Sequence, residues 1–155
     1  QLGEMLRNNG EYEESRKVYE RCLAGQERVL GEDHRDSLTT VNNLGAVYIS
    51  LKNYGKALEY YKRALKGQEK LLGKTHPETL NIVMNIATVY QDGLKDYGKA
   101  GRLYQRALEG YEAQLGKDHK HTKDCAWNFA DLLKKSGNSA GLEALKEAHP
   151  NVESY

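Results

Sequence analysis

The sequence predicts an all-α fold, a right-handed α-solenoid of stacked antiparallel helix pairs, and three observations support this prediction. Marker residues recur every 42 or 43 positions along the 155 residues. Within each period the apolar residues are three and four positions apart, which is the spacing of one helix face. No segment alternates between apolar and polar residues, so no strand is expected. A single helix pair of this size cannot bury both of its faces, whereas stacked pairs can.

The repeat is clearest at a turn that contains a glycine and a histidine. Gly31, Gly73 and Gly116 each follow a leucine and precede a histidine by three positions, and they are 42 and 43 residues apart. Tyr90 still follows its partner Tyr48 by 42 residues, so the extra residue comes after Tyr90 and before Leu94. We expect this insertion to fall at a helix end or turn.

Each period is expected to form two helices. The turn glycines should end the second helices in a left-handed conformation, as C-terminal glycines commonly do. Thr75 and Glu78 resemble a capping box, with Pro77 in the first helical turn. Residues 1–10 look like the tail of a severed helix, which suggests an excised fragment. Helices are expected at 12–30, 36–51, 54–72, 78–92, 97–115, 120–135 and 139–148.

We expect residues 1–155 to form a single array. It would consist of a partial first repeat (1–30), two repeats (36–72 and 78–115), a C-terminal repeat with a capping helix (120–149) and a tail (150–155).

Composition excludes several classes of function. The formal net charge is +1, so the chain lacks the positive field that attracts nucleic acid. No apolar run approaches the roughly 18–20 residues that span a bilayer, so membrane insertion is not expected. Two cysteines do not make a disulfide scaffold and favour a reducing compartment, which predicts a cytoplasmic protein.

No residue pattern points to catalysis, a metal or a cofactor, so we expect a protein that is not an enzyme. His34, His76 and His119 recur with the repeat and should lie about 10 Å apart, too far to share one metal ion. We assign them a capping or turn-packing role. Cys22 takes the place of a small alanine in the other repeats and is expected to be buried. Cys125 has no paired base at helical spacing.

Most of the tyrosines are explained by the repeat. Two series are expected in the core: Tyr12, Tyr54 and Tyr97, and Tyr19, Tyr61 and Tyr104. Tyr60 and Tyr111 lie off these stripes and are expected at the surface.

Small residues and aromatics recur together in a pattern that resembles the tetratricopeptide repeat (TPR). One unit carries Leu44, Gly45, Tyr48, Ala57, Tyr61 and Ala64, and similar sets recur across residues 1–136. The second helix is about two turns longer than in the common TPR. Asn42-Asn43 and the Leu-Gly-Lys-Thr-His-Pro turn at 72–77 resemble the kinesin light chain type of this repeat.

The resemblance implies a protein–protein interaction module that binds a short peptide segment of a cargo or adaptor protein in a concave groove. It also implies a kinesin-light-chain-like cargo adaptor, associated with microtubules and with kinesin heavy chain through parts outside these residues. The alternative is a TPR regulatory or scaffolding arm of a larger signalling protein or ATPase. A third hypothesis is a purely structural array that self-associates.

In a TPR stack the first helices line the concave surface. An asparagine series, Asn43, Asn85 and Asn128, lies beside the core stripe of these helices. An amide can donate and accept at once, as a peptide backbone requires. The series forms either a ladder that grips an extended ligand or bonds between adjacent helices. Met84 and Trp127 are apolar anchors, unless a neighbouring unit buries them. The expected groove residues are Asn42, Asn43, Ala46, Asn81, Met84, Asn85, Thr88, Asp124, Trp127, Asn128, Asp131 and Lys135. Further candidates are Arg7, Asn8, Thr39, Ile49, Ser50, Gln91, Asp92 and Lys134.

Overall fold

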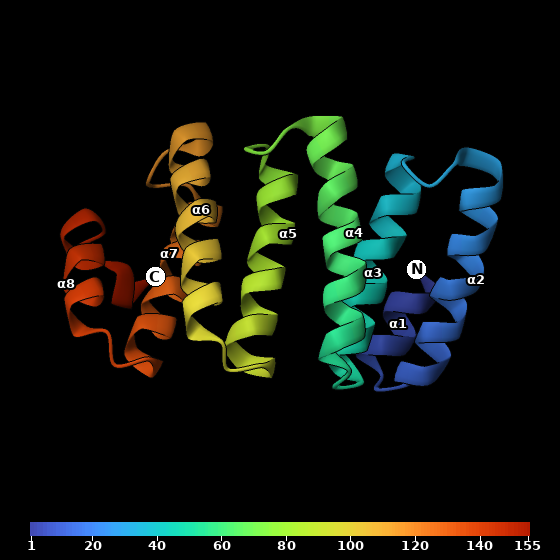
Figure 1. Cartoon of the computed structure of the whole chain (residues 1–155), viewed down its shortest axis with the longest axis horizontal. Coiled ribbons are helices and arrows are strands. Elements are labelled where there is room, and N and C mark those ends of the chain that lie inside the picture. The colour runs from blue at the N-terminus through green and yellow to red at the C-terminus, as the bar shows by residue number, and fades with distance from the viewer. The chain divides into compact units, whose positions relative to one another are not determined.

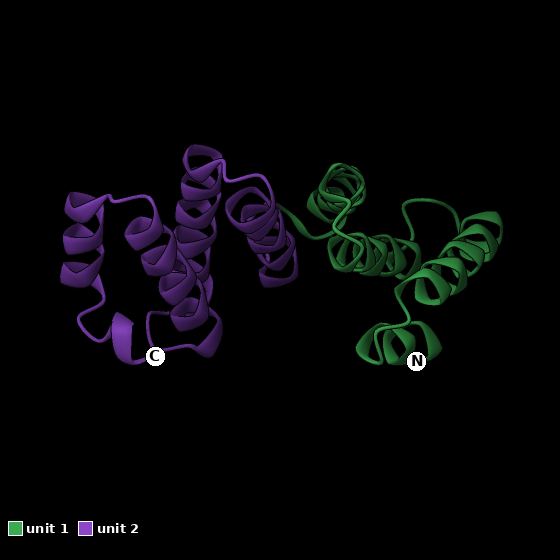
Figure 2. Ribbon diagram, turned by 90° about the horizontal axis from the view of Figure 1, so that it is seen from below, with its two compact units in different colours: residues 1–73 green, residues 74–155 purple.

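The computed structural model describes residues 1–155 and consists of helices joined by short turns (Figure 1). The all-α prediction is confirmed. The chain divides into two compact units, residues 1–73 and 74–155 (Figure 2). No helix combines the length and the apolar character that a membrane crossing needs. The first unit contains α1 (Leu2–Asn8), α2 (Tyr12–Leu30), α3 (Arg35–Ser50) and α4 (Tyr54–Leu72). The second contains α5 (Pro77–Thr88), η1 (Val89–Gly93), α6 (Tyr97–Leu115), α7 (Lys120–Lys135), α8 (Ser139–Ala148) and η2 (Val152–Ser154).

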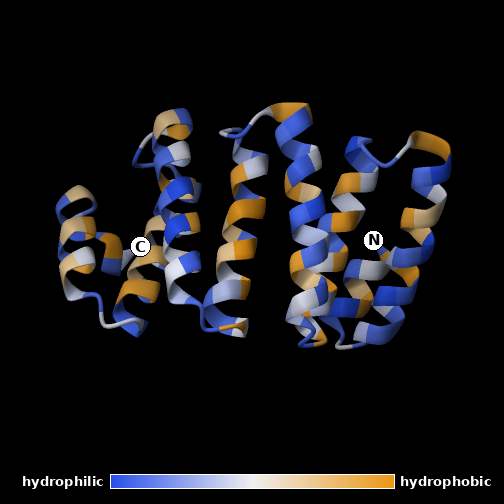
Figure 3. Cartoon of the chain, viewed as in Figure 1, coloured by the Kyte–Doolittle hydropathy of each residue, from blue (hydrophilic) through white to orange (hydrophobic).

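Each helix packs against the next one in its own unit, as expected for stacked helix pairs. In the first unit α2 contacts both α1 and α3, and α3 contacts α4. In the second unit α6 contacts both α5 and α7, and α7 also contacts α8 and η2. Figure 3 shows hydrophobic and hydrophilic residues on every α-helix, which is the amphipathic pattern that such packing requires. Six of the seven expected helices have both ends within one residue of the prediction.

The exception is the helix expected at 78–92, where the structure absorbs the extra residue of the repeat. The α-helix ends at Thr88, and residues Val89–Gly93 form a π-helix. Its wider turn is closed by the hydrogen bond from the Leu94 amide to the Val89 carbonyl, 3.0 Å long. A π-turn accommodates one extra residue without breaking the helix, so the insertion lies at a helix end, as expected.

Two glycines let the second helices approach the first helices closely. A methyl group on Gly110 would lie 2.6 Å from a Leu80 methyl carbon, and a methyl group on Gly67 would overlap Leu38 in the first unit. The matching glycine of the first pair, Gly25, has no atom within 4 Å of such a methyl. The repeat therefore uses glycine here for close packing, and the seven-residue α1 does not reach this point of α2.

The three repeat histidines cap helices, which confirms the role that the sequence predicts. The Nδ1 atoms of His34, His76 and His119 accept hydrogen bonds of 3.1–3.2 Å from the amides two residues later. Because His76 is the N-cap of α5, the capping box expected from Thr75 and Glu78 is wrong, and the imidazole takes the place of the threonine hydroxyl.

The turns between the two helices of each pair share an unexpected feature. Gly10, Lys52, Lys95 and Gly137 occupy the same turn position, at steps of 42, 43 and 42 residues, and all four have φ between 56° and 83°. Glycine adopts this conformation freely, whereas lysine is strained in it. The repeat therefore fixes the turn even where the residue type is unfavourable.

The core holds Tyr19, Tyr61 and Tyr104, each at most 7% exposed, but it does not hold every tyrosine that the repeat suggests. Tyr12 is 37% exposed, and Tyr54 and Tyr97 are half-buried, because each begins a second helix and lies at the edge of the packed layer. The expectation that Tyr111 is exposed is wrong. It is 1% exposed, stacks on His121 and donates a long hydrogen bond to the Pro77 carbonyl.

The expected burial of Cys22 is also wrong. Ala64 and Ala107, which hold the matching positions, are fully buried, whereas Cys22 is exposed. The reason is the shortness of α1, which covers the first half of α2 through the contact of Gly3 with Tyr19 but not the residues beyond Tyr19.

Candidate functional site

The candidate residues of the first unit form an uncharged surface on α3, which we call the α3 face. Asn42, Asn43 and Ala46 are half-buried along one side of the helix. Thr39 and Ser50 donate their hydroxyl hydrogens to carbonyls of the same helix, at 3.0 and 3.3 Å. The other polar side chains of this face are the amides of Asn42 and Asn43. The α3 face comprises Thr39, Asn42, Asn43, Ala46, Ile49 and Ser50.

The candidates of the second unit lie on α5 and α7. On α5, Asn81 is exposed, whereas Met84, Asn85 and Thr88 are half-buried. The Thr88 hydroxyl bonds to the Met84 carbonyl and to the Tyr104 hydroxyl, each at 3.1 Å, so it also ties α5 to a core tyrosine of α6. The surface on α7, which we call the α7 face, comprises Asp124, Trp127, Asn128, Asp131, Lys134 and Lys135.

A polar cluster joins the π-turn to α7. The Gln91 side chain donates a 2.8 Å hydrogen bond to Asp131, and Lys135 lies 2.8 Å from Asp131 and 3.7 Å from Asp92. The hydrogen bond with Asp131 raises the pKa of Lys135 above its ordinary value. Gln91 is only 3% exposed, so the suggestion that it lines a groove is wrong. It instead holds α7 to η1.

Every charged side chain of the α7 face is paired within the chain. Asp124 lies 2.7 Å from Lys120, and Lys134 lies 2.6 Å from Glu153. Glu153 also pairs with Lys146, and the hydrogen bonds with Lys134 and Lys146 lower its pKa. The charged groups of this face therefore form ion pairs within the chain.

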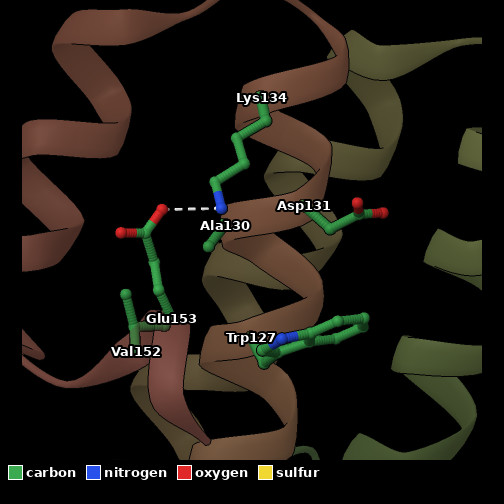
Figure 4. A pocket seen from close by; sticks show the side chains of 6 residues that line it. All are labelled: Trp127, Ala130, Asp131, Lys134, Val152 and Glu153. Carbon is green, nitrogen blue, oxygen red and sulfur yellow. Dashed lines mark ion pairs between the residues drawn. The ribbon is translucent and has the colours of Figure 1, made fainter.

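Trp127 is the largest apolar group on this face and is 47% exposed. It lines a small pocket of about 50 Å³ with Ala130, Asp131, Lys134 and the turn of Val152 and Glu153. In Figure 4 the Trp127 ring and the Asp131 carboxylate project to the same side of α7, away from Glu153. No neighbouring helix of the second unit buries this ring, which leaves it available as an anchor.

The third amide of the asparagine series is partly occupied. The Asn128 amide nitrogen donates a 3.0 Å hydrogen bond to the Asp124 carbonyl of its own helix. An amide has two N–H groups and one oxygen, so one donor and the acceptor are left for another partner. Asn43, Asn85 and Asn128 are all half-buried beside the core stripe, at matching positions of three first helices.

Sequence reasoning missed the contribution of the C-terminal residues. Val152 is fully buried, and His149 is 1% exposed with Nε2 2.7 Å from a Glu112 oxygen. Residues 149–155 follow the last period of the repeat, so no repeat position predicts where they pack. Only the isolated valine among polar residues could have suggested a buried contact.

Comparison with solved structures finds the same fold in chains that include two described as kinesin light chain proteins with TPR-like repeats and one described as BtubC (BKLC). A kinesin light chain candidate from Podosopora anserina with nearly identical TPR-like repeats has a TM-score of 0.86 and 20% identity, over 99% of this chain and 74% of that chain. A singly substituted form of the same protein has a TM-score of 0.84 and 20% identity, over 95% and 69%. BtubC (BKLC) from P. vanneervenii has a TM-score of 0.87 and 19% identity, over 99% and 61%.

The sequence comparisons decide the family. No curated protein sequence matches the chain. The tetratricopeptide repeat family matches residues 1–70, 36–100 and 78–141, which overlap and together cover most of the 155 residues. The chain therefore belongs to the tetratricopeptide repeat family, and its fold is that of the kinesin light chain-like members of known structure.

Proposed function

We propose that this protein binds short, extended segments of a partner protein on the first helices of each unit, at the α3 face of the first unit and at the α7 face of the second. Tetratricopeptide repeats are protein-interaction modules, and membership in this family supports the general function. The observation that carries the specific proposal is the exposed Trp127 on a face whose charged groups are already paired. Tryptophan is the residue type most often found as an interface anchor.

The chemistry of the two faces defines the ligand class. The α3 face offers amides and small side chains, and the α7 face offers an indole next to an amide. An extended segment would place its backbone N–H and C=O groups against the amides and an apolar side chain against Trp127. Because ordering such a segment costs chain entropy, the dissociation constant is expected in the micromolar range.

A narrower form of the proposal makes the protein a cargo adaptor in the cytoplasm, linked to microtubules through a kinesin heavy chain. It is supported by the Asn42-Asn43 pair, by the Leu-Gly-Lys-Thr-His-Pro turn and by the likeness to kinesin light chain-type folds. The same form of the proposal treats residues 1–155 as a single array, as the repeat predicts.

Selection of peptides from a random display library tests the general proposal. The purified chain should enrich a family of peptides, and these should bind at least tenfold more weakly to a triple variant with Asn43→Ala, Asn85→Ala and Asn128→Ala. Circular dichroism of the variant should show unchanged helix content. Equal binding by a folded triple variant would remove the asparagines from the site, and a failed selection would contradict the function itself.

A further inference from the structure

Gly101 is a glycine in the interior of α6 that the packing of the helix does not require. Glycine in a helix interior costs stability because it gains backbone freedom on unfolding. At Gly110 of the same helix, close contact with Leu80 explains this cost. At Gly101 an added methyl would meet only Leu132, at an ordinary contact distance of 3.5 Å. The matching residue of α4, 43 positions earlier, is the buried Leu58.

The missing side chain leaves a hollow between α6 and α7. It has a volume of about 460 Å³, within the range of sites that hold ligands. Its walls include Tyr97 of α6 and Phe129, Leu132 and Leu133 of α7. The two leucines are buried core residues, at 1% and 6% exposure, so the hollow has a fixed apolar floor.

A positively charged side chain, Arg102, lies at the rim of this hollow. Arg102 is exposed and lines the hollow next to Gly101, whereas the matching residue of α4 is Glu59. Asp96, the acidic group that Arg102 influences, forms its ion pair with Lys99 at 3.2 Å. Arg102 itself forms no ion pair within the chain, so its guanidinium can pair with an outside partner. The Leu58-Glu59 pair of α4 therefore corresponds to Gly101-Arg102 in α6, which has no side chain at the first position and a positive charge at the second.

We propose that the hollow between α6 and α7 binds a second partner segment, one that presents an aliphatic side chain directly next to a carboxylate. The aliphatic side chain fills the space that leucine fills in α4, and the carboxylate pairs with Arg102. The partner thus supplies the two groups that this repeat lacks. The site is separate from the α3 and α7 faces, and its residues take no part in the function proposed above.

The two contacts are complementary in chemistry. Filling the hollow removes apolar surface of both partners from water, which favours binding without selecting a sequence. The guanidinium has a fork of N–H donors that matches a carboxylate, so it selects an acidic neighbour over a neutral or basic one.

A subtractive selection tests the proposal. A random peptide display library is first depleted on the Gly101→Leu variant, in which the hollow is filled, and is then selected on the unchanged chain. Peptides that bind the α3 or α7 face bind both proteins and are removed in the first step. The surviving peptides should share an aliphatic residue adjacent to aspartate or glutamate. They should bind at least tenfold more weakly to Arg102→Glu and should shift the amide resonances of Gly98 and Gly101.

The folding of the depletion variant is checked first, and each possible result of the selection then either supports or overturns the proposal. Leucine favours helix formation and fits the space, so Gly101→Leu should melt at the same or a higher temperature. If it fails to fold, Arg102→Glu, a surface change, replaces it in the depletion step. Survivors without an acidic residue, survivors that bind Arg102→Glu equally well, or no survivors would each overturn the proposal. Light scattering that shows a dimer of the unchanged chain, abolished by Gly101→Leu, would replace the partner with a second copy.

Discussion

The α3 face and the α7 face occupy matching positions of the repeat, 85 residues apart, yet they avoid unpaired charge in different ways. The α3 face has no ionisable side chain, whereas four of the six residues on the α7 face are charged and each is paired within the chain. Asn42 in one face corresponds to Trp127 in the other. On the proposed function, this comparison predicts that both faces bind through apolar and amide contacts rather than through charge recognition.

The cores of the two units also differ, in the size of the side chain at one matching position. Gly45 packs against the Tyr61 ring in the first unit, whereas Ala87 holds the matching position opposite Tyr104 in the second. Tyr104 is also tied by its hydroxyl to Thr88. The same repeat position therefore accepts different volumes, because each helix pair has adjusted to its own side chains.

The largest expected difference between the units is the reactivity of their cysteines. Cys22 is exposed, whereas Cys125 is fully buried, and burial raises the pKa of the Cys125 thiol from 9.0 to about 12. Only the thiolate reacts, so a shift of this size lowers its population about a thousandfold. With a thiol reagent at about pH 7.5, Cys22 should react at once and Cys125 only after unfolding. Equal rates would contradict the packing of α7.

The same thiol gives a pH dependence with a defined sign. The folded state favours the neutral thiol, so its contribution to stability is complete below pH 9 and is lost as the pH rises toward 12. Burial also raises the pKa of Tyr61 and Tyr104 to about 12, and their contributions are lost between pH 10 and 12. The melting temperature should fall over this range. A Cys125→Ala variant, compared with the unchanged chain, should show a smaller fall between about pH 9 and 10.

The next largest effect is the loss of stability expected when the matching core residues Gly45 and Ala87 are exchanged. Gly45→Ala would place a methyl 2.7 Å from the Tyr61 ring, and overpacking of this kind costs about 1–3 kcal/mol. Ala87→Gly loses a buried methyl and gains chain entropy, at a cost of about 1–2 kcal/mol. Thermal melts should show a lower melting temperature for both variants than for the unchanged chain. Gly55→Ala is the control, since its methyl would meet only Asn53 at 4.0 Å, and a loss of stability there would contradict the account.

A smaller effect is expected at the turns. Lys52 has a φ of 57°, and replacing it by glycine should stabilise the protein by about 1 kcal/mol, because the left-handed strain is relieved. Lys56→Gly makes the same chemical change inside α4 and should destabilise by about 1 kcal/mol. Denaturant titrations of the two variants should therefore move in opposite directions. A shift in the same direction would rule out strain as the cause.

The smallest effect concerns the ion pairs of the α7 face. Asp131→Asn removes the pair with Lys135 but keeps an acceptor for Gln91, so stability should change by less than about 1 kcal/mol. Affinity for a selected peptide should change by less than about threefold between roughly 50 and 500 mM salt, because the ligand contacts no unpaired charge. A steep loss of affinity with salt would show that charge recognition dominates.

The repeat made most of the fold predictable from the sequence. Periodic features such as the helix ends, the histidine caps and the position of the insertion follow from spacing alone. The π-turn after Thr88 did not, since spacing locates an extra residue but does not say how the backbone absorbs it. The burial of Tyr111 and the exposure of Cys22 depend on which neighbouring helix is present at that point.

The candidate site was less predictable than the fold. Helical spacing selected the correct side of α7, but it could not show that Lys134 pairs with Glu153 or that Asp131 is held by Gln91. These contacts join segments far apart in the sequence, and one of them involves residues after the last repeat. The left-handed turns were detectable, because Gly10 and Gly137 mark the position that Lys52 and Lys95 share.

Titration calorimetry on Trp127→Ala tests the central claim most directly. The ligand is a peptide selected on the unchanged chain, and the matched control is Leu94→Ala, since Leu94 is 46% exposed, lies outside both faces and is comparable to Trp127 at 47%. We predict that Trp127→Ala weakens binding at least tenfold, whereas Leu94→Ala leaves the dissociation constant unchanged. Equal affinity of both variants and the unchanged chain would show that the peptide binds elsewhere.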